Sequence, residues 1–291
     1  MKKILVITIL MVFSTGTAGA DDVGQALSGL APQPVVQSTR QLIQAGANRA
    51  ATIDVTRAML QYGFTARQTL SAHAVLMNTH QQGLPLEPII SKAFEGMSKH
   101  VPADSIVNAM QKVQSRQAYA NLKAQNFASR KAQVNLMGHI IAAGLAAGME
   151  PSGLEVIAHE LQARSQPMAP DQKTALALET FKAARDMARL GVSSSQIASV
   201  VAAALQHEFT AEQMHAMRTA FIKDSRTTAP QSAAAGYAKA IEQGKNFGGQ
   251  TGAAGSTGAS HGGSGSGGGG GPGGSGGSGG PGGPGGPGGN H

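Results

Sequence analysis

The 291-residue chain contains 41% hydrophobic residues, 4% aromatic residues and no cysteine, and its formal net charge is +7. The lack of cysteine excludes disulfides, thiol catalysis and a cysteine-linked lipid anchor. The modest positive charge permits contact with anionic surfaces, but the sparse aromatics and the absence of a dense basic run argue against nucleic-acid binding.

Residues 1–20 have the pattern of a secretory signal peptide. Two lysines begin the segment, an apolar run follows, and Ala-Gly-Ala at 18–20 suits signal peptidase. The apolar run is too short to cross a bilayer, which requires about 20 residues. We expect cleavage between Ala20 and Asp21, leaving 21 Lys plus Arg against 16 Asp plus Glu, net +5. The pattern predicts export by the general secretory route to the periplasm or the cell exterior, with no transmembrane segment in the mature chain.

Residues 21–247 are predicted to form an all-α domain. Ala, Gln, Leu, Met and Lys are frequent helix formers, and apolar residues recur at helical spacing. One expected core stripe comprises Ile89, Ile90, Ala93, Phe94 and Met97, and a second comprises Ile197, Val200, Val201, Ala204 and Leu205.

A recurring signal marks the expected helix starts. An apolar residue precedes a cap or turn residue, and another apolar residue follows, as in a hydrophobic staple. The expected pairs are Leu84/Ile89, Val101/Ile106, Val192/Ile197 and Phe209/Met214. Capping boxes are expected at Thr65/Gln68, Ser193/Gln196 and Thr210/Gln213. Glycines at 63, 83, 148 and 191 precede these starts, where glycine suits the end of the previous helix.

Residues 83–113 align without a gap on residues 191–221, at an offset of 108 positions. Four positions are identical and most apolar positions match in type, although Met110 stands opposite Arg218. The alignment predicts an internal duplication of short stapled helices in helical-hairpin repeats, either solenoid-like or as a duplicated bundle. The alternative is a single bundle whose short helices all have good caps.

Residues 248–291 are rich in Gly, Ser and Pro and contain no charged residue. Such a composition has little to bury, so we expect a disordered tail that serves as a spacer or tether.

The most suggestive metal-binding group is His207, Met214, His215 and Met217, because imidazole and thioether ligands suit copper(I). Met214 and Met217, however, coincide with staple and core positions, where methionine is an ordinary gap filler. We therefore predict neither a metal site nor a cofactor.

Other candidate motifs are incomplete. His159-Glu160 lacks the second histidine of a zinc-protease helix, since Ala163 stands in its place. His73 and His80 share a helical face but have no specified third ligand. The basic pair Arg130-Lys131 is a candidate contact for an anionic surface. The sequence contains no motif of a serine hydrolase or a phosphate-binding loop, so no catalytic residue is predicted.

Lys92, Glu95, Gly96 and Lys99 precede Val101-Pro102, with Ile106 in the following helix. This string resembles a pattern in uncharacterised secreted bacterial helical-repeat proteins. In residues 191–221 the three charged positions are Val200, Ala203 and His207, so the charges are not common to both segments. The resemblance implies an exported bacterial helical protein and carries no activity with it.

These patterns predict an exported, non-enzymatic binding or scaffold protein of the bacterial cell envelope. Its expected partner is an envelope protein or an anionic envelope polymer. The alternatives are a glycan-acting envelope enzyme and a periplasmic metal-handling protein. A glycan-acting enzyme would require a cleft with a charge-coupled acid whose pKa is raised.

Overall fold

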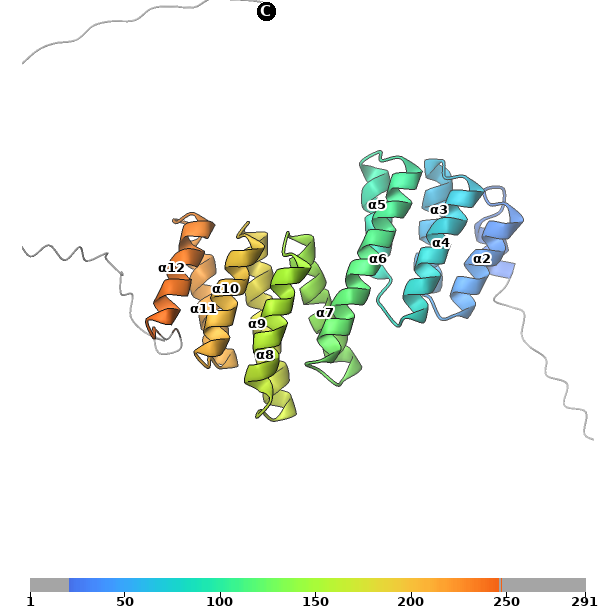
Figure 1. Ribbon diagram of the computed structural model, residues 1–291. Helices are drawn as coiled ribbons and strands as arrows, with labels where there is room; N and C mark the ends of the chain where they lie inside the picture. The colour runs from blue at the N-terminus through green and yellow to red at the C-terminus, as the bar shows by residue number, and fades with distance from the viewer. Residues whose placement is uncertain (1–20, 246, 248–291) are drawn as a thin grey trace, which may run out of the picture. The chain divides into compact units, whose positions relative to one another are not determined.

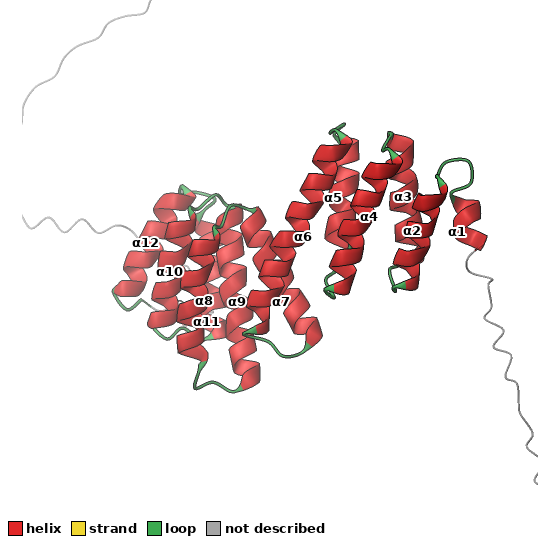
Figure 2. Cartoon of the chain, turned by 45° about the vertical axis from the view of Figure 1, so that its right-hand side comes forward, coloured by secondary structure: helices red, strands yellow, loops and turns green. Residues whose placement is uncertain are grey.

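The computed structural model describes residues 21–245 and residue 247, and these contain twelve helices and no strand (Figures 1 and 2). The prediction of an all-α fold is therefore confirmed. The expected signal peptide and the Gly-rich tail lie outside the described residues. The helices are α1 (Asp21–Ala26), α2 (Gln33–Gln44), α3 (Arg49–Tyr62), α4 (Ala66–Gln81), α5 (Glu87–Ser98), α6 (Ala103–Gln125), α7 (Lys131–Ala146), α8 (Pro151–Ser165), α9 (Pro170–Arg189), α10 (Ser194–Gln206), α11 (Ala211–Asp224) and α12 (Pro230–Glu242).

Most helices pack against the helix two positions along the chain (Figure 1). α2 packs on α4 and α4 on α6, while α3 packs on α5. After the α6–α7 pair, α7 packs on α9 and α9 on α11, while α8 packs on α10 and α10 on α12. Each half of the described chain thus contains two rows of helices.

The buried apolar residues form two large clusters that share α6. One cluster extends from Leu42 to Val113 and the other from Ala120 to Ile241. α6 spans 23 residues, so the expectation that the helices are short is wrong for this element. Between its contributions to the two clusters, α6 buries the amide side chains of Gln114 and Gln117.

Many helices end on a residue with positive φ that is followed by an apolar residue. Gly191, with φ 85°, donates to the Ala188 carbonyl at 2.9 Å, and Val192 donates to the Met187 carbonyl at 3.1 Å. These two bonds form the helix-ending motif for which glycine is favoured. Val192 is buried and also precedes the cap of α10, so one apolar residue closes one helix and staples the next.

Two residues with side chains adopt the same backbone conformation. His100 ends α5 with φ 56° and Glu208 ends α10 with φ 57°, and they are 108 positions apart. The residue after each donates to the equivalent carbonyl, from Gly96 and Ala204 respectively, at 3.0 Å in both cases. Because neither position is glycine, the sequence gives no signal for these turns.

The start of α5 differs from the expected staple. Its N-cap is Leu86 and its first residue is Glu87, so Leu84 and Pro85 precede the helix. A start at Pro85 would place Pro88 in the fourth helical position, where a backbone N–H is required. Starting at Glu87 leaves Pro88 in the first turn, where that donor is not needed.

Two other local expectations were wrong. Phe94 is 41% exposed, because it lies at the edge of a stripe centred on Ile89 and Ala93. Ser193 is the N-cap of α10, but its side chain accepts no backbone N–H of the helix, and its hydroxyl donates to Gln196 Oε1 at 3.3 Å instead. Its backbone N–H donates to Gln231 Oε1 of α12 at 3.3 Å, the role expected of Gln196. The capping boxes at Thr65 and Thr210 are formed as predicted.

Candidate functional site

Two adjoining hollows lie between the end of α6, the body and end of α8, and the start of α9. Their volumes are about 420 Å³ and 470 Å³, and both are lined by Asn126, Phe127 and Gln162. We call the combined feature the α6–α8 groove. Its other lining residues are Lys123, Gln125, Ala128, Ser129, Glu155, Ala158, His159, Ser165, Gln166, Met168, Pro170, Lys173 and Thr174.

Packed side chains fix the turn after α6 against α9 at one side of the groove. Phe127 is buried and packs edge-to-face on Phe181, with ring centroids 5.7 Å apart. The Thr174 hydroxyl donates to the Phe127 carbonyl at 2.9 Å and so ties the α6–α7 turn to the first turns of α9. This anchored turn forms one wall of the groove, while the α8–α9 turn forms the other.

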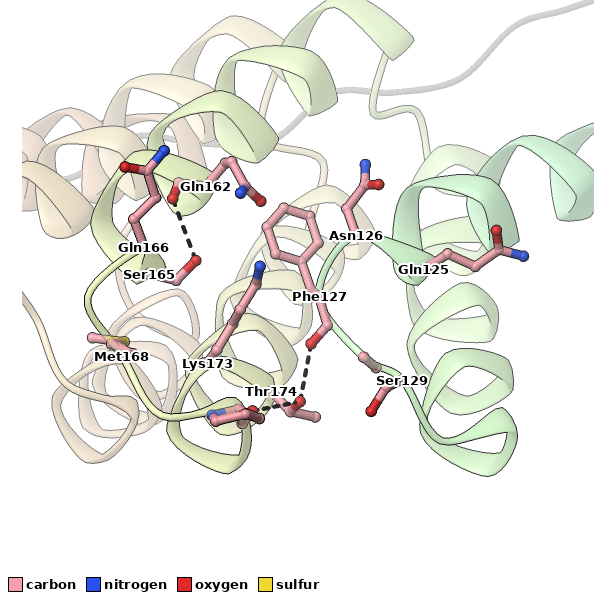
Figure 3. A pocket seen from close by; sticks show the side chains of 12 residues that line it. Gln125, Asn126, Phe127, Ser129, Gln162, Ser165, Gln166, Met168, Lys173 and Thr174 are labelled. Carbon is pink, nitrogen blue, oxygen red and sulfur yellow. Dashed lines mark hydrogen bonds between the residues drawn. The ribbon is translucent and has the colours of Figure 1, made fainter.

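Lys173 supplies a cation between the two turns that line the groove. Its side chain is half-buried, and its ammonium lies 5.6 Å from the centroid of the Phe127 ring. Figure 3 shows this side chain extending between Ser165 and the Phe127 ring toward Gln162. Within the described part of the chain, no carboxylate pairs with Lys173. A lysine ammonium held against an aromatic face is available to an anionic group.

Amide side chains surround this ammonium. Asn126, Gln162 and Gln166 are exposed, and their side chains form no hydrogen bond with another described residue. Each amide offers two donors and one acceptor oxygen. The groove can therefore hold a ligand that is rich in oxygen acceptors and carries negative charge.

At the other end of the groove, Glu155 is already paired. Lys123 Nζ lies 2.6 Å from its Oε1, and the Tyr119 hydroxyl donates to the same oxygen at 2.7 Å. These hydrogen bonds hold the pKa of Glu155 below its usual range. Burial and the adjacent carboxylate raise the pKa of Tyr119 to about 12. Glu155 thus stays ionised and Tyr119 stays protonated, which suits structural pairing and not proton transfer.

The predicted basic pair lies beside the groove. Arg130 precedes α7 and directly follows Ser129, a lining residue, and Lys131 begins the helix. An Arg130 side-chain nitrogen lies 3.5 Å from Asp171 Oδ1, and both side chains are largely exposed. This pair can add positive charge at the edge of the groove, although Arg130 shares its charge with a neighbour.

The candidate copper ligands are not brought together. Met214 and Met217 are fully buried in the second apolar cluster. His215 Nδ1 lies 3.1 Å from Glu179 Oε2, and His207 is the exposed C-cap of α10. Within residues 21–245 and 247, no group of three or more His, Asp or Glu side chains is placed to hold a metal ion.

The other histidines singled out in the sequence, His73, His80 and His159, and the Lys-Glu-Lys motif have protein partners. His73 is buried between Thr56 Oγ1 at 2.9 Å and Ser38 Oγ at 3.0 Å. His80 Nε2 lies 2.6 Å from the Ala45 carbonyl, and exposed His159 lies 3.5 Å from Glu160. Hydrogen bonds from Lys92 and Lys99 lower the pKa of Glu95 to about 2.

A second charged cluster joins α9 to α11 and was not predicted. Arg218 contacts Asp186 at 3.0 Å and Glu179 at 3.4 Å. Lys182 lies 2.6 Å from Glu179, and Arg185 lies 2.7 Å from Asp186. Burial raises the pKa of Glu179, but hydrogen bonds from Lys182 and His215 outweigh it and hold that pKa below its usual range. None of these side chains lines the α6–α8 groove.

The groove could not be predicted from the sequence, because its key residues come from separate segments. Lys173, Gln162 and Asn126 lie in three different elements and share no local motif. Compared with protein-family models, curated proteins and solved structures, the chain matches none. Among the described helices, none has both the length and the apolar character required to cross a membrane.

Proposed function

We propose that this chain is an exported, non-enzymatic binding protein of the bacterial cell envelope, and that the α6–α8 groove receives an anionic, oxygen-rich envelope polymer. Removal of the signal peptide between Ala20 and Asp21 would leave every described helix intact, because α1 begins at Asp21. Intact mass of the exported protein tests this step, and retention of residues 1–20 would contradict it.

The same proposal includes an internal duplication of helical-hairpin units. The packing of α2 on α4 on α6, with α3 on α5, recurs as α7 on α9 on α11, with α8 on α10. The positive-φ turns at His100 and Glu208 support the 108-residue offset independently, because they match in backbone conformation without sharing a glycine. Arrays of helical pairs provide extended surfaces that commonly bind long partners.

The observation that carries the binding proposal is the unpaired Lys173 ammonium in a groove lined by unpaired amides. A carboxylate or phosphate of a polymer can accept from this ammonium, while the amides bind neighbouring sugar or peptide groups. Arg130 and Lys131 would strengthen the attraction from the edge of the groove. The alternative of a glycan-acting enzyme gains no support from the paired Glu155, since a general acid requires a raised pKa.

Co-sedimentation with purified peptidoglycan and with lipopolysaccharide tests the proposal. We expect retention at about 0.05 M salt that weakens at about 0.5 M, because screening shortens the reach of the charges. Lys173→Gln should weaken retention by about tenfold, the loss expected for one charge-assisted contact. Arg130→Gln and Lys131→Gln should have smaller effects.

Lys112→Gln is the matched control, since Lys112 is exposed and does not line the groove. Equal retention of the Lys173 and Lys112 variants would contradict the groove assignment. Absence of retention on either polymer at low salt would contradict the anionic-polymer proposal. Salt-insensitive retention would also contradict it and would favour a protein partner held by apolar contacts.

A further inference from the structure

A separate hollow of about 560 Å³ lies between the first turns of α4 and α6. Its volume falls within the range typical of small-molecule sites, about 300–1,000 Å³. We call it the α4–α6 hollow. Its lining is polar except for the buried Val107, and comprises Thr65, Arg67, Gln68, Ser71, Asp104, Val107, Asn108 and Gln111.

A bridge of hydrogen bonds fixes the one carboxylate of this hollow. Gln68 Oε1 accepts from the Thr65 backbone N–H at 2.9 Å, as part of the capping box of α4. Gln68 Nε2 donates to Asp104 Oδ1, also at 2.9 Å. Because Gln68 is held at both ends, Asp104 is oriented before any ligand arrives. Its second oxygen has no partner among the described residues.

Three other polar side chains of the hollow, those of Arg67, Asn108 and Gln111, have no partner among the described residues. Arg67 is exposed and forms no ion pair with Asp104 or with another described carboxylate. The side-chain amides of Asn108 and Gln111 have no hydrogen-bond partner in the described chain. Arg67 can bind a carboxylate through its planar donor fork, and Asp104 can accept from an ammonium group.

The equivalent surface in the second half provides an informative contrast. At an offset of 108, α9 and α11 stand where α4 and α6 stand, and both pairs are in contact. There, the positions of Ser71 and Val107 are Glu179 and His215, which pair with each other at 3.1 Å. Among the described residues, the first of these helix pairs therefore places an arginine and an aspartate around a hollow without an ion pair, whereas the second pairs its Glu179 and His215.

We propose that the α4–α6 hollow binds a small zwitterionic ligand, a free amino acid or a short peptide. Arg67 receives the ligand carboxylate, Asp104 receives its ammonium, and Asn108 and Gln111 bind the intervening amide. Pairing both charges is favourable here because neither protein group has to give up an existing partner. This site is distinct from the α6–α8 groove and does not depend on what that groove binds.

The test uses glycylglycine as the probe, with N-acetylglycylglycine lacking the ammonium and glycylglycinamide lacking the carboxylate. Side-chain amide signals of Gln68, Asn108 and Gln111 in a heteronuclear NMR titration report on the hollow itself. We expect saturable shifts with glycylglycine in the millimolar range and about tenfold weaker binding of each blocked form, since each loses one charged contact.

Two variants assign the roles. Arg67→Gln should abolish the preference for the free carboxylate, and Asp104→Asn, which keeps the acceptor for Gln68, should abolish the preference for the free ammonium. Arg226→Gln and Glu87→Gln are charge-matched controls outside the hollow and should leave the titration unchanged. Absence of saturable shifts, equal binding of all three probes, or unchanged preferences in both variants would overturn the proposal.

Discussion

The α4–α6 and α9–α11 helices both pack as pairs, but the two pairs differ in the chemistry of the residues that lie between them. In the first, Met110 is fully buried in an apolar cluster. In the second, the residue 108 positions later is Arg218, which contacts two carboxylates of α9. The Asp186 carboxylate that pairs with Arg218 likewise replaces Asn78. The α9–α11 pair thus has an ion cluster in addition to its buried apolar contacts, at a position where the α4–α6 pair has an apolar residue.

The two halves also differ in their buried polar groups. α2, α3 and α4 bury five threonines, and each hydroxyl donates to a carbonyl of its own helix, four residues earlier. The ions of α9 and α11 are satisfied across helices. Apart from Thr56, which also contacts His73 of α4 at 2.9 Å, the printed bonds of these hydroxyls stay within one helix and its N-cap, whereas the paired ions link α9 directly to α11 and restrict how the two helices pack.

The largest expected effect follows from breaking the ion cluster. Asp186→Ala would leave the half-buried Arg185 and Arg218 without this carboxylate, and we expect a loss of about 3 kcal/mol in the free energy of unfolding. Urea denaturation followed by circular dichroism measures it. The double variant Asp186→Asn with Arg218→Met installs the residues of the first half and should be less destabilised than Asp186→Asn alone. Equal destabilisation would contradict the comparison.

An effect of similar size is expected from acid in the first half. Burial lowers the pKa of His73 to about 4, against about 6.5 in an unfolded chain. Between these pH values the unfolded chain binds a proton that the folded chain excludes. Stability should therefore fall as the pH drops from about 6.5 to about 4, by up to about 3 kcal/mol, and should be unaffected by this group above 6.5.

His73→Gln provides the control because it retains hydrogen-bonding groups but cannot take up a proton. Unfolding free energies at about pH 7 and pH 5 should converge in this variant, since the carboxylates titrate mainly below about pH 4.5. A variant that retains the full pH dependence of the native protein would show that other groups cause it.

The sequence predicts local features of this fold better than it predicts contacts between distant segments. The capping boxes at Thr65 and Thr210 depend on residues three positions apart, so their pattern is visible in the sequence. The cap of α10 failed because Gln231, from α12, took the place of Gln196. In the alignment of residues 83–113 with 191–221, Arg218 appears only as a mismatch with Met110. Its ion-pair partners lie in another helix, so the sequence does not predict them. The Lys173 site required three segments to meet and had no sequence signal.

A moderate effect is expected where α5 meets α6. A Cβ added at Gly96 would lie 2.7 Å from Ile106 Cγ1, and in the second half Ala204 and Met214 occupy these positions. The branched side chain of Ile106 thus leaves room only for glycine at position 96, whereas the unbranched Met214 leaves room for alanine at position 204. We expect Gly96→Ala to destabilise by about 1 kcal/mol, since overpacking outweighs the gain in helix propensity. Adding Ile106→Met should recover most of that loss, and the lack of any recovery would contradict this explanation.

The smallest expected effect concerns the paired turns at His100 and Glu208. Both residues hold positive φ, which costs about 1 kcal/mol for a residue with a side chain, while glycine adopts this conformation freely. Glycine also makes the unfolded chain more flexible, so His100→Gly and Glu208→Gly should each stabilise by only about 0.5 kcal/mol. The Glu208 carbonyl also accepts a hydrogen bond from Arg164 at 3.3 Å. Because this bond is to the backbone, glycine at position 208 retains it and the expected gain is unchanged. Matched gains in melting temperature would support equivalent turns at the 108-residue offset. If glycine raises the melting temperature at one site and lowers it at the other, the side chain at the second site makes a stabilising contact that its counterpart lacks. The two turns would then be equivalent in backbone conformation only.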